Sequence, residues 1–374
     1  MTIGTMHRTL RLALVALLVG ACSSSPPASP SPSTGPTRTP TSTSTPDPTN
    51  TPTAEPTATL APTPGETAFA ALDGMPADPA KANRLPVAVM IDDNVIARPQ
   101  SGFNAASIVY QAPADGGEDR YMLIFQEQDA PDIGPVRSGR PYFVYWAAEY
   151  RAGFAHYGGD EKTRFRVIPA ATGKIMYDLD ALAGSGRAFH RISGRDAPHN
   201  AYTSTADLWK TTARKKYPAT MVAGLAARPF ADDAPASKRP AKGSITIPYG
   251  RGATGYTYDP ATNSYLRSVA GKAQKDAADG QRVVARNVVV LWMALSIDPE
   301  SEVGHKRPAL AQIGKGTAWV FRDGKIIKGT WRKKDQGGLT SFFDAAGDEI
   351  SLVRGRIFIQ VVPTGTKVTY DAAE

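Results

Sequence analysis

A long stretch without apolar side chains limits how much of this 374-residue chain can fold. Of the 42 residues from 23 to 64, 32 are Ser, Thr or Pro, and none is aromatic. Such a segment cannot bury enough apolar surface to offset the conformational entropy that ordering would cost. We therefore expect a disordered tether over residues 22–66 and a folded body that begins near residue 67. A body of about 300 residues is long enough for two ordinary domains.

The residues before the tether are typical of a bacterial lipoprotein signal. A basic start that includes Arg8 and Arg11 precedes an apolar run from 12 to 19, and Cys22, the only cysteine, follows. The run is shorter than the ~20 residues of a bilayer-spanning helix, so it predicts a cleaved export signal over residues 1–21. We expect the Cys22 thiol to be acylated, which anchors the protein to the cell membrane on its extracytoplasmic side. The alternative is an ordinary signal peptide followed by an incidental cysteine.

The folded body carries the whole formal net charge of +8, because residues 1–66 contain three basic and three acidic residues. A pI near 9.4 predicts attraction to polyanions. In a cell envelope the expected anionic partners are wall glycans and lipid phosphates. The export signal argues against a nucleic-acid partner, and no zinc-finger spacing or RNA-binding motif occurs. No cofactor is expected.

A second change of composition predicts a domain boundary. Residues 231–243 contain no large apolar side chain and are interpreted as a linker. Residues 67–230 alternate short apolar runs with helical stretches, which favours an α/β layered domain. Residues 244–374 alternate with period two, which favours a mainly antiparallel β domain, so the expected class is α+β. In the first domain we expect strands near residues 85–91, 107–111, 121–126 and 154–157, a helix over 140–150, and a capped helix beginning at Ser204.

Turn signals predict how the strands of the second domain connect. Asp323-Gly324 lies between two apolar runs, and Asp-Gly in this setting is a strong hairpin signal. Hairpins are also expected between residues 256–260 and 264–267 and around Arg354-Gly355, and one long strand over residues 283–296.

An arginine-bearing loop is the main candidate for ligand binding. Residues 133–141 place Arg137 and Arg140 three positions apart, with Ser138 between them, in a backbone shaped by glycines and prolines. The planar guanidinium fork matches phosphate and carboxylate groups. A helix expected to begin at the end of this segment would add backbone N–H donors. We therefore expect an anion site here, with Arg98 also contributing.

Polar residues on neighbouring segments are expected to line the same cleft. Asp92 follows the first strand, where ligand sites of open α/β sheets usually lie, and a carboxylate there can act as a general base. The alternatives are an Asx turn after the strand and a structural role in which Arg137 and Arg140 pair with carboxylates such as Asp92 or Glu149. The candidates for this polar pocket are Asp92, Asn94, His156, His199, Asn200 and Tyr202.

Several short motifs occur together and in order, at residues 89–94, 97–102, 108–110, 134–138, 156–159 and 197–202, with further stretches at 287–290 and 329–331. Together these motifs resemble those of the YerB-like family of bacterial lipoproteins. The resemblance covers nearly the whole chain beyond the tether. It implies an exported, lipid-anchored, two-domain protein from a family with no established biochemical activity.

Two classes of function remain open. The first is a binding module that holds an anionic envelope ligand in the arginine-rich cleft. The second is an envelope hydrolase or transferase with Asp92, His156 or His199 as acid or base. No zinc-protease, serine-hydrolase, Walker or dinucleotide motif is present in the sequence, so no metal site is predicted. The hypothesis of an enzyme therefore rests on these side chains alone.

Overall fold

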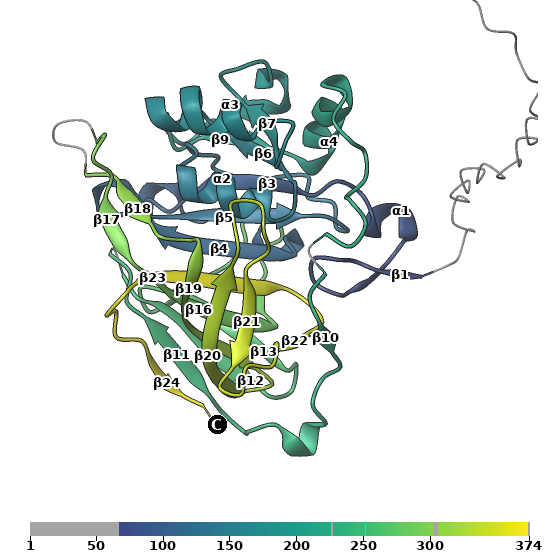
Figure 1. Cartoon of the computed structure of the whole chain (residues 1–374), viewed down its shortest axis with the longest axis vertical. Helices are drawn as coiled ribbons and strands as arrows, with labels where there is room; N and C mark the ends of the chain where they lie inside the picture. Colours follow the sequence, from purple (N-terminus) through teal and green to yellow (C-terminus); the bar gives the residue numbers. More distant parts are fainter. Residues whose placement is uncertain (1–66, 226, 251, 302–305, 373–374) are drawn as a thin grey trace, which may run out of the picture. The chain divides into compact units, whose positions relative to one another are not determined.

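The computed structural model describes residues 67–225, 227–250, 252–301 and 306–372, which are coloured in Figure 1. The predicted export signal (1–21), the lipidation site Cys22 and the tether (22–66) lie outside the described residues. Within the described ranges, no helix has both the length and the apolar character to cross a membrane.

A ten-stranded mixed sheet joins the two halves of the sequence. Its central strands β4 and β23 pair in parallel, with Ile108 opposite Ile357. Because β4 precedes and β23 follows residues 231–243, the sheet crosses the boundary expected there, and the division into domains stays a prediction. In spatial order the strands are β21 (Ser341–Asp344), β20 (Lys325–Lys333), β19 (Gly314–Arg322), β16 (Asn287–Met293), β23 (Ile357–Pro363), β4 (Ile108–Pro113), β5 (Asp119–Phe125), β3 (Val87–Asp92), β6 (Gly153–His156) and β7 (Tyr177–Asp180).

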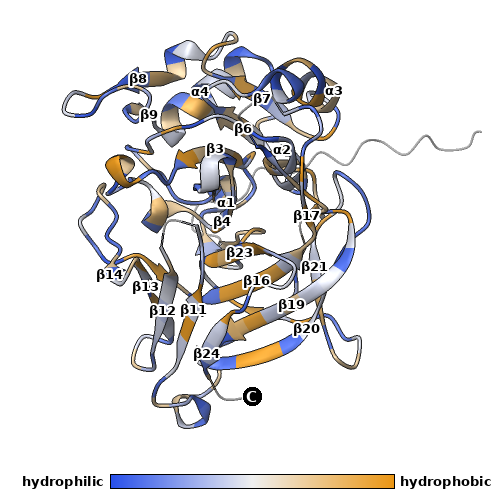
Figure 2. Cartoon of the chain, turned by 90° about the vertical axis from the view of Figure 1, so that its left-hand side faces the viewer, coloured by the Kyte–Doolittle hydropathy of each residue, from blue (hydrophilic) through white to orange (hydrophobic). Residues whose placement is uncertain are grey.

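Both faces of this sheet are covered, which explains the continuous apolar runs of its central strands. Met90 of β3 faces the cluster formed with helix α2, whereas Val89 faces the cluster formed with Leu208 of helix α4. All six residues of β3 are buried. A strand buried on both faces has no reason to alternate apolar with polar residues. Figure 2 shows the same hydrophobic character along β16 and β23.

Helices α2 and α4 begin where the sequence predicts them. α2 (Pro141–Ala148) has proline at its first position, and α4 (Thr205–Arg214) is capped by Ser204, whose Oγ accepts a hydrogen bond from the Asp207 amide at 3.1 Å. The other helical segments are α1 (Pro79–Ala82), α3 (Ile168–Ala171), η1 (Val95–Ala97), η2 (Phe103–Ala105), η3 (Asp115–Gly117), η4 (Thr163–Val167), η5 (Gly186–Ala188) and η6 (Ala236–Lys238).

A second, antiparallel sheet lies on the α4 side of the large sheet, and its residues Tyr256 and Tyr265 share a core with β3 and β23. Two predicted hairpins are confirmed. β12 pairs with β13, and β19 pairs with β20 across Asp323 and Gly324, whose φ angles are 53° and 74°. Positive φ at both central residues is what a type I′ turn requires. The second sheet consists of β14 (Lys272–Ala273), β13 (Ser264–Val269), β12 (Thr254–Asp259), β11 (Ser244–Ile247) and β24 (Thr369–Asp371), with β15 (Val284–Ala285) beside β13.

The third expected hairpin, around Arg354-Gly355, is wrong. β22 (Leu352–Val353) pairs with β10 (Phe230–Ala231), whereas β23 leaves for the centre of the large sheet and pairs in parallel with β16 and β4. Six of the seven residues of β23 are buried, as a central strand requires.

The single long strand expected over residues 283–296 is also divided, and the remaining short strands complete the fold. Taken together, the described residues form the expected mixed α/β structure with mostly antiparallel sheets, so the α+β class is confirmed. Residues 283–296 contribute to β15, β16 and β17 (Leu295–Ile297), and the other short strands are β1 (Ala68–Phe69), β2 (Pro76–Ala77), β8 (Phe189–Arg191), β9 (Ala201–Thr203) and β18 (Pro308–Leu310).

Candidate functional site

A buried carboxylate at the end of β3 holds two of the predicted site residues. Oδ2 of Asp92 lies 2.6 Å from Nδ1 of His199 and 3.1 Å from Nε of Arg137. The Asp92 side chain is only 2% exposed, whereas those of His199 and Arg137 are 12% and 21% exposed. We refer to these three residues as the Asp92 cluster.

The backbone brings the segments of the Asp92 cluster together. The loop that carries Arg137 runs beside the end of β3, with the Arg137 amide donating to the Met90 carbonyl at 2.9 Å. The Val136 amide on the same loop donates to the Ala201 carbonyl at the start of β9 at 2.6 Å, which fixes the turn that carries His199. Close contact also explains one glycine of this loop, because a Cβ at Gly134 would lie 2.6 Å from the Tyr202 ring.

Asn200 and Tyr202 shape the β8–β9 turn. The Asn200 amide nitrogen donates to the carbonyls of Arg195 at 3.0 Å and Ile192 at 3.3 Å. The Tyr202 hydroxyl accepts a hydrogen bond from Nη1 of Arg195 at 2.7 Å. These contacts hold the turn closed, so both residues position His199.

Arg98 and Asn94 contact neighbouring carboxylates. Arg98 donates from Nη2 to Oδ1 of Asp93 at 2.8 Å, and the Asn94 side chain donates to Glu118 at 2.6 Å. Burial raises the pKa of Asp93, and the positive charge of Arg98 offsets part of that rise. Asn94 also begins η1, where its own side chain accepts from the Ile96 amide.

The structure does not bring Arg140 to the Asp92 cluster. Arg140 forms an ion pair with Asp115, and its side chain is 9% exposed. Burial raises the pKa of Asp115, but the hydrogen bonds and charge of Arg140 outweigh that effect and leave this pKa below its ordinary value. Ser138 donates from Oγ to the Tyr157 carbonyl at 3.2 Å. Its hydroxyl is therefore engaged with the segment that follows β6.

His156 is buried and lies among different partners. Its Nε2 is 3.0 Å from Oδ1 of Asp178, and its Nδ1 is 2.7 Å from the Gly158 carbonyl oxygen. Its side chain is 0% exposed. The geometry is that of a hydrogen-bonded histidine which fixes the end of β6.

Two arginines near the Asp92 cluster carry charge that no described carboxylate neutralises. Arg191 contacts the Asn200 side chain, and its guanidinium lies 4.8 Å from the centre of the Tyr157 ring. Arg195 donates to the carbonyls of Ala97 and Pro99 and to a tyrosine hydroxyl. Arg195 was not among the site residues predicted from the sequence. The glycine turn Ser193-Gly194 before it, together with the basic residues on both sides, is the signal that could have identified it.

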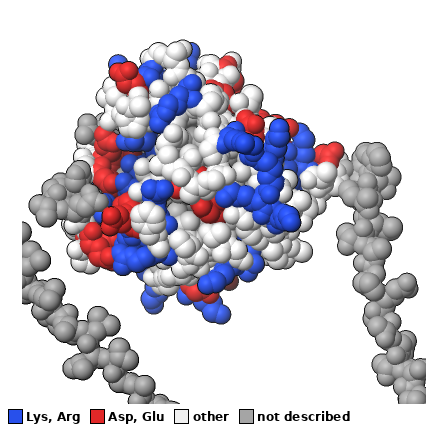
Figure 3. Space-filling view, turned by 90° about the horizontal axis from the view of Figure 1, so that it is seen from above, with Lys and Arg blue, Asp and Glu red and all other residues white. Residues whose placement is uncertain are grey.

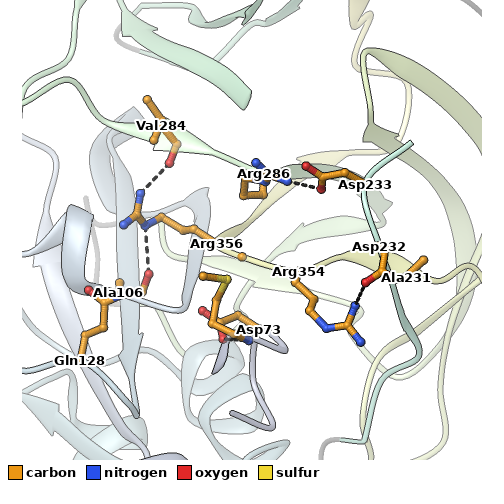
Figure 4. A pocket seen from close by; sticks show the side chains of 12 residues that line it. Asp73, Ala106, Gln128, Ala231, Asp232, Asp233, Val284, Arg286, Arg354 and Arg356 are labelled. Atoms are coloured by element: carbon orange, nitrogen blue, oxygen red, sulfur yellow. Dashed lines mark hydrogen bonds and ion pairs between the residues drawn. The ribbon is translucent and has the colours of Figure 1, made fainter. Parts of the chain in front are cut away.

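A pocket of about 420 Å³ lies elsewhere, between segments from both halves of the sequence (Figure 4). Three arginines and three aspartates line it, so its formal charges cancel. Each arginine already has a described partner. The contacts are Arg286 with Asp233, Arg354 with Asp232, and Arg356 with the carbonyl oxygens of Ala106 and Val284.

No group of three or more His, Cys, Asp or Glu side chains within the described ranges is arranged to hold a metal ion. The acidic residues near the Asp92 cluster contact arginines, asparagine and histidine instead.

Comparisons with known proteins show which family has this architecture. Residues 72–218 match the N-terminal domain, and residues 245–359 the C-terminal domain, of a protein family described as DUF3048, of unknown function. YerB of Bacillus subtilis (strain 168), whose name describes it as a lipoprotein, is 29% identical over 298 residues, which is 79% of this chain and 86% of that protein. The crystal structure of the B. subtilis YerB protein matches with a TM-score of 0.70 and 26% identity, covering 81% of this chain and 99% of that one.

The fold and the matched domains define a mixed α/β protein of the DUF3048 class. The chain belongs to the YerB-like family, which confirms the resemblance inferred from its motifs.

Proposed function

We propose that this chain is a lipid-anchored cell-envelope protein that binds an anionic group, a phosphate or a carboxylate, at the Asp92 cluster. The observation that carries the proposal is the shared buried carboxylate: one oxygen of Asp92 is hydrogen-bonded to His199 and forms an ion pair with Arg137. Donor groups that are already oriented lose little conformational freedom when a ligand arrives.

The cluster leaves donors available for a ligand. Arg137 approaches Asp92 through Nε, and its terminal nitrogens have no hydrogen-bond partner among the described residues. Two parallel N–H groups of a guanidinium match two oxygens of a phosphate or a carboxylate. An ionised Asp92 only accepts, so Nδ1 of His199 carries the proton, and Nε2 has no partner within the described part of the chain.

Charge near the cluster supports an anionic ligand. Arg191 and Arg195 form no ion pair with a described carboxylate and lie on the segment that carries His199. Attraction by such partly exposed charges weakens as salt screens them, over ~8 Å at physiological ionic strength.

The same geometry supports a second candidate, an envelope hydrolase or transferase. A histidine whose Nδ1 donates to a buried aspartate is held in the orientation of a general base. No side-chain nucleophile accompanies it among the described contacts of the Asp92 cluster, because the Ser138 hydroxyl donates to a backbone carbonyl. Water would then be the nucleophile in this candidate reaction.

Binding is tested by calorimetry on the full-length protein with inorganic phosphate, a muropeptide and a polyprenyl phosphate. A charge-assisted hydrogen bond contributes about 1.5–3 kcal/mol, so Arg137→Ala is expected to weaken binding about tenfold or more. Arg166→Ala is the matched control, because it removes the same charge from an exposed arginine paired with Glu300. Equal affinity of wild type and Arg137→Ala for every bound probe would refute the proposal.

Hydrolysis is tested with the probes that bind, by following release of the product over time. Asp92→Asn keeps the shape of the side chain but weakens the orientation of His199. A turnover that falls in Asp92→Asn and His199→Ala, measured at a probe concentration that saturates each variant, would support the enzymatic candidate. Binding without turnover in the wild type supports the binding module.

The anchor is tested separately by metabolic labelling with a fatty acid. Cys22→Ser is expected to lose the label, because the thiol is the acylated group. Label retained in this variant would contradict anchoring at Cys22.

A further inference from the structure

A groove of about 540 Å³ lies between the loop that follows β7 and the last turn of α4. No carboxylate is among its lining residues, in contrast with the charge-balanced pocket of Figure 4. None of its residues belongs to the Asp92 cluster. The lining residues are Gly184, Gly186, Arg187, Thr211, Arg214 and Lys215.

The two segments that form the groove are strongly basic. Residues 181–188 and 205–217 contain five Lys or Arg and one Asp, which gives 5 − 1 = +4. The single acid, Asp207, is at the opposite end of α4, where it is bound to Ser204. Seen from above, Figure 3 shows Lys and Arg gathered on the side of the molecule where Figure 1 draws α4.

The buried acid that precedes this loop already has other partners. Asp180 ends β7 and lies just before the loop, but its carboxylate accepts from the Gly158 and Leu182 amides and contacts Arg164. It is 3% exposed. Its negative charge is therefore balanced by these partners and not by the cations of the groove.

The three cations of the groove have no ion pair with a described carboxylate. Arg214 contacts the hydroxyl of Thr211, and the Lys215 ammonium lies 5.8 Å from the centre of the Tyr217 ring. Like charges held together repel one another, and a bound anion would relieve that repulsion. The opposite wall is close to this ammonium, since a Cβ at Gly184 would lie 3.8 Å from Nζ of Lys215, and the φ of 83° at Gly184 favours glycine there.

Three backbone carbonyl groups at the C-terminal end of α4 are already hydrogen-bonded. The Thr211, Thr212 and Ala213 carbonyls accept hydrogen bonds from the amides of the residues that follow the helix. Cations near a helix C-terminus are stabilised by its dipole, which explains how a basic cluster is tolerated there without acidic partners.

We propose that this groove is a second anion site, which binds a phosphate group. Three cations without a carboxylate favour a multiply charged anion over a single carboxylate, and the arginine forks match phosphate oxygens. The phosphate belongs either to a lipid headgroup or to a soluble molecule. This site does not depend on the function proposed for the Asp92 cluster.

The experiment measures binding of the full-length protein to pyrophosphate by calorimetry. In parallel, it measures co-sedimentation with vesicles of phosphatidylglycerol or phosphatidylcholine. The difference between the two vesicles removes the contribution of an acyl anchor, which is common to both. Arg187→Ala and Lys215→Ala are expected to weaken binding about tenfold or more, because a charge-assisted contact is lost. Arg187 is exposed and Lys215 is partly exposed, and an unchanged melting temperature will verify folding.

Lys210→Ala is the matched control, since this exposed lysine of α4 is outside the groove lining. It is expected to bind within about twofold of wild type. Pyrophosphate binding that remains in Arg137→Ala is assigned to the groove, which separates failure here from failure of the Asp92 cluster.

If the wild type binds pyrophosphate and the groove variants lose this binding, the ligand is a soluble phosphate. If the wild type does not bind pyrophosphate but prefers phosphatidylglycerol vesicles, and the groove variants lose this preference, the ligand is a lipid headgroup. The proposal is overturned if neither probe binds, or if Arg187→Ala and Lys215→Ala bind as tightly as wild type.

Discussion

The ammonium of Lys333 lies 2.9 Å from Oε1 of Glu149, and neither side chain is exposed to solvent. Lys333 ends β20, whereas Glu149 follows α2, so this buried ion pair joins the two halves of the sequence. The Thr340 amide and hydroxyl also donate to Glu149, at 3.0 and 2.6 Å. The carboxylate is thus the centre of a buried polar network.

Lys333→Met is expected to lower the free energy of unfolding by about 3–5 kcal/mol, because it leaves Glu149 charged and less well compensated in the core. Chemical denaturation of the purified protein measures this. Lys334→Met, at the neighbouring position, is the control. If Lys333→Met and Lys334→Met have equal stability, the ion pair does not contribute as argued.

Asp119 gives stability a specific dependence on pH. Burial, followed by repulsion from Asp93, raises its pKa from 3.8 to about 8. The folded state therefore keeps a proton that the unfolded state releases above about pH 4. The resulting stabilisation is complete below pH 4 and is lost as the pH rises to about 8.

Asp119→Asn removes this titration. Relative to the variant, the wild type is expected to lose on the order of several kcal/mol of unfolding free energy between pH 4 and 8. Denaturant titrations at successive pH values measure the difference. Asp348→Asn, at an exposed carboxylate, serves as the control. A wild-type-minus-variant difference that stays constant with pH would rule out the raised pKa.

Both the backbone conformation at position 324 and the small space beside it require glycine. The φ of Gly324 is 74°, and an added Cβ would lie 2.5 Å from Cε1 of Tyr258. Gly324→Ala is expected to destabilise the protein by about 1–3 kcal/mol, through strain and overpacking together. Gly347→Ala separates the two effects, because Gly347 has a φ of 95° but nothing within 4 Å of an added Cβ. Thermal unfolding should rank Gly324→Ala as the less stable variant, and the reverse order would contradict the close contact.

Arg267 is a buried cation that also links the two halves of the sequence. Its side chain, in β13, donates to Oε1 of Gln111 in β4 at 2.6 Å and to the Tyr121 hydroxyl in β5 at 3.1 Å. Arg267→Met is expected to cost about 3 kcal/mol of stability, since both acceptors lose a charged donor inside the core. Arg322→Met changes a partly exposed arginine of β19 and is expected to cost less than about 1 kcal/mol. Equal losses in denaturant unfolding would show that Arg267 is not a specific link.

The structure explains why spacing along the chain was misleading for Arg137 and Arg140. The loop that carries them is extended, with bridges at Val136 and Gly139. Successive side chains of an extended chain point to opposite sides, so residues three apart face different neighbours. Arg137 therefore contacts Asp92, whereas Arg140 contacts Asp115. The sequence placed two arginines in one loop but could not predict that their side chains separate.

The sequence by itself determined the elements whose causes are local. The apolar run of β3, the Ser204 cap of α4 and the Asp323-Gly324 turn each depend on residues only a few positions apart. Backbone conformation and short-range hydrogen bonds are sufficient to define such features.

The tertiary structure alone decided the relationships between distant segments. His199 meets Asp92 across 107 positions, and β23 pairs with β4, which lies before the predicted linker. The same apolar run can serve as one arm of a hairpin or as a central parallel strand, because both bury it. Which of these two arrangements forms depends on the distant strands that are available for pairing and on the partners that buried charges find. No local pattern in the sequence contains this information.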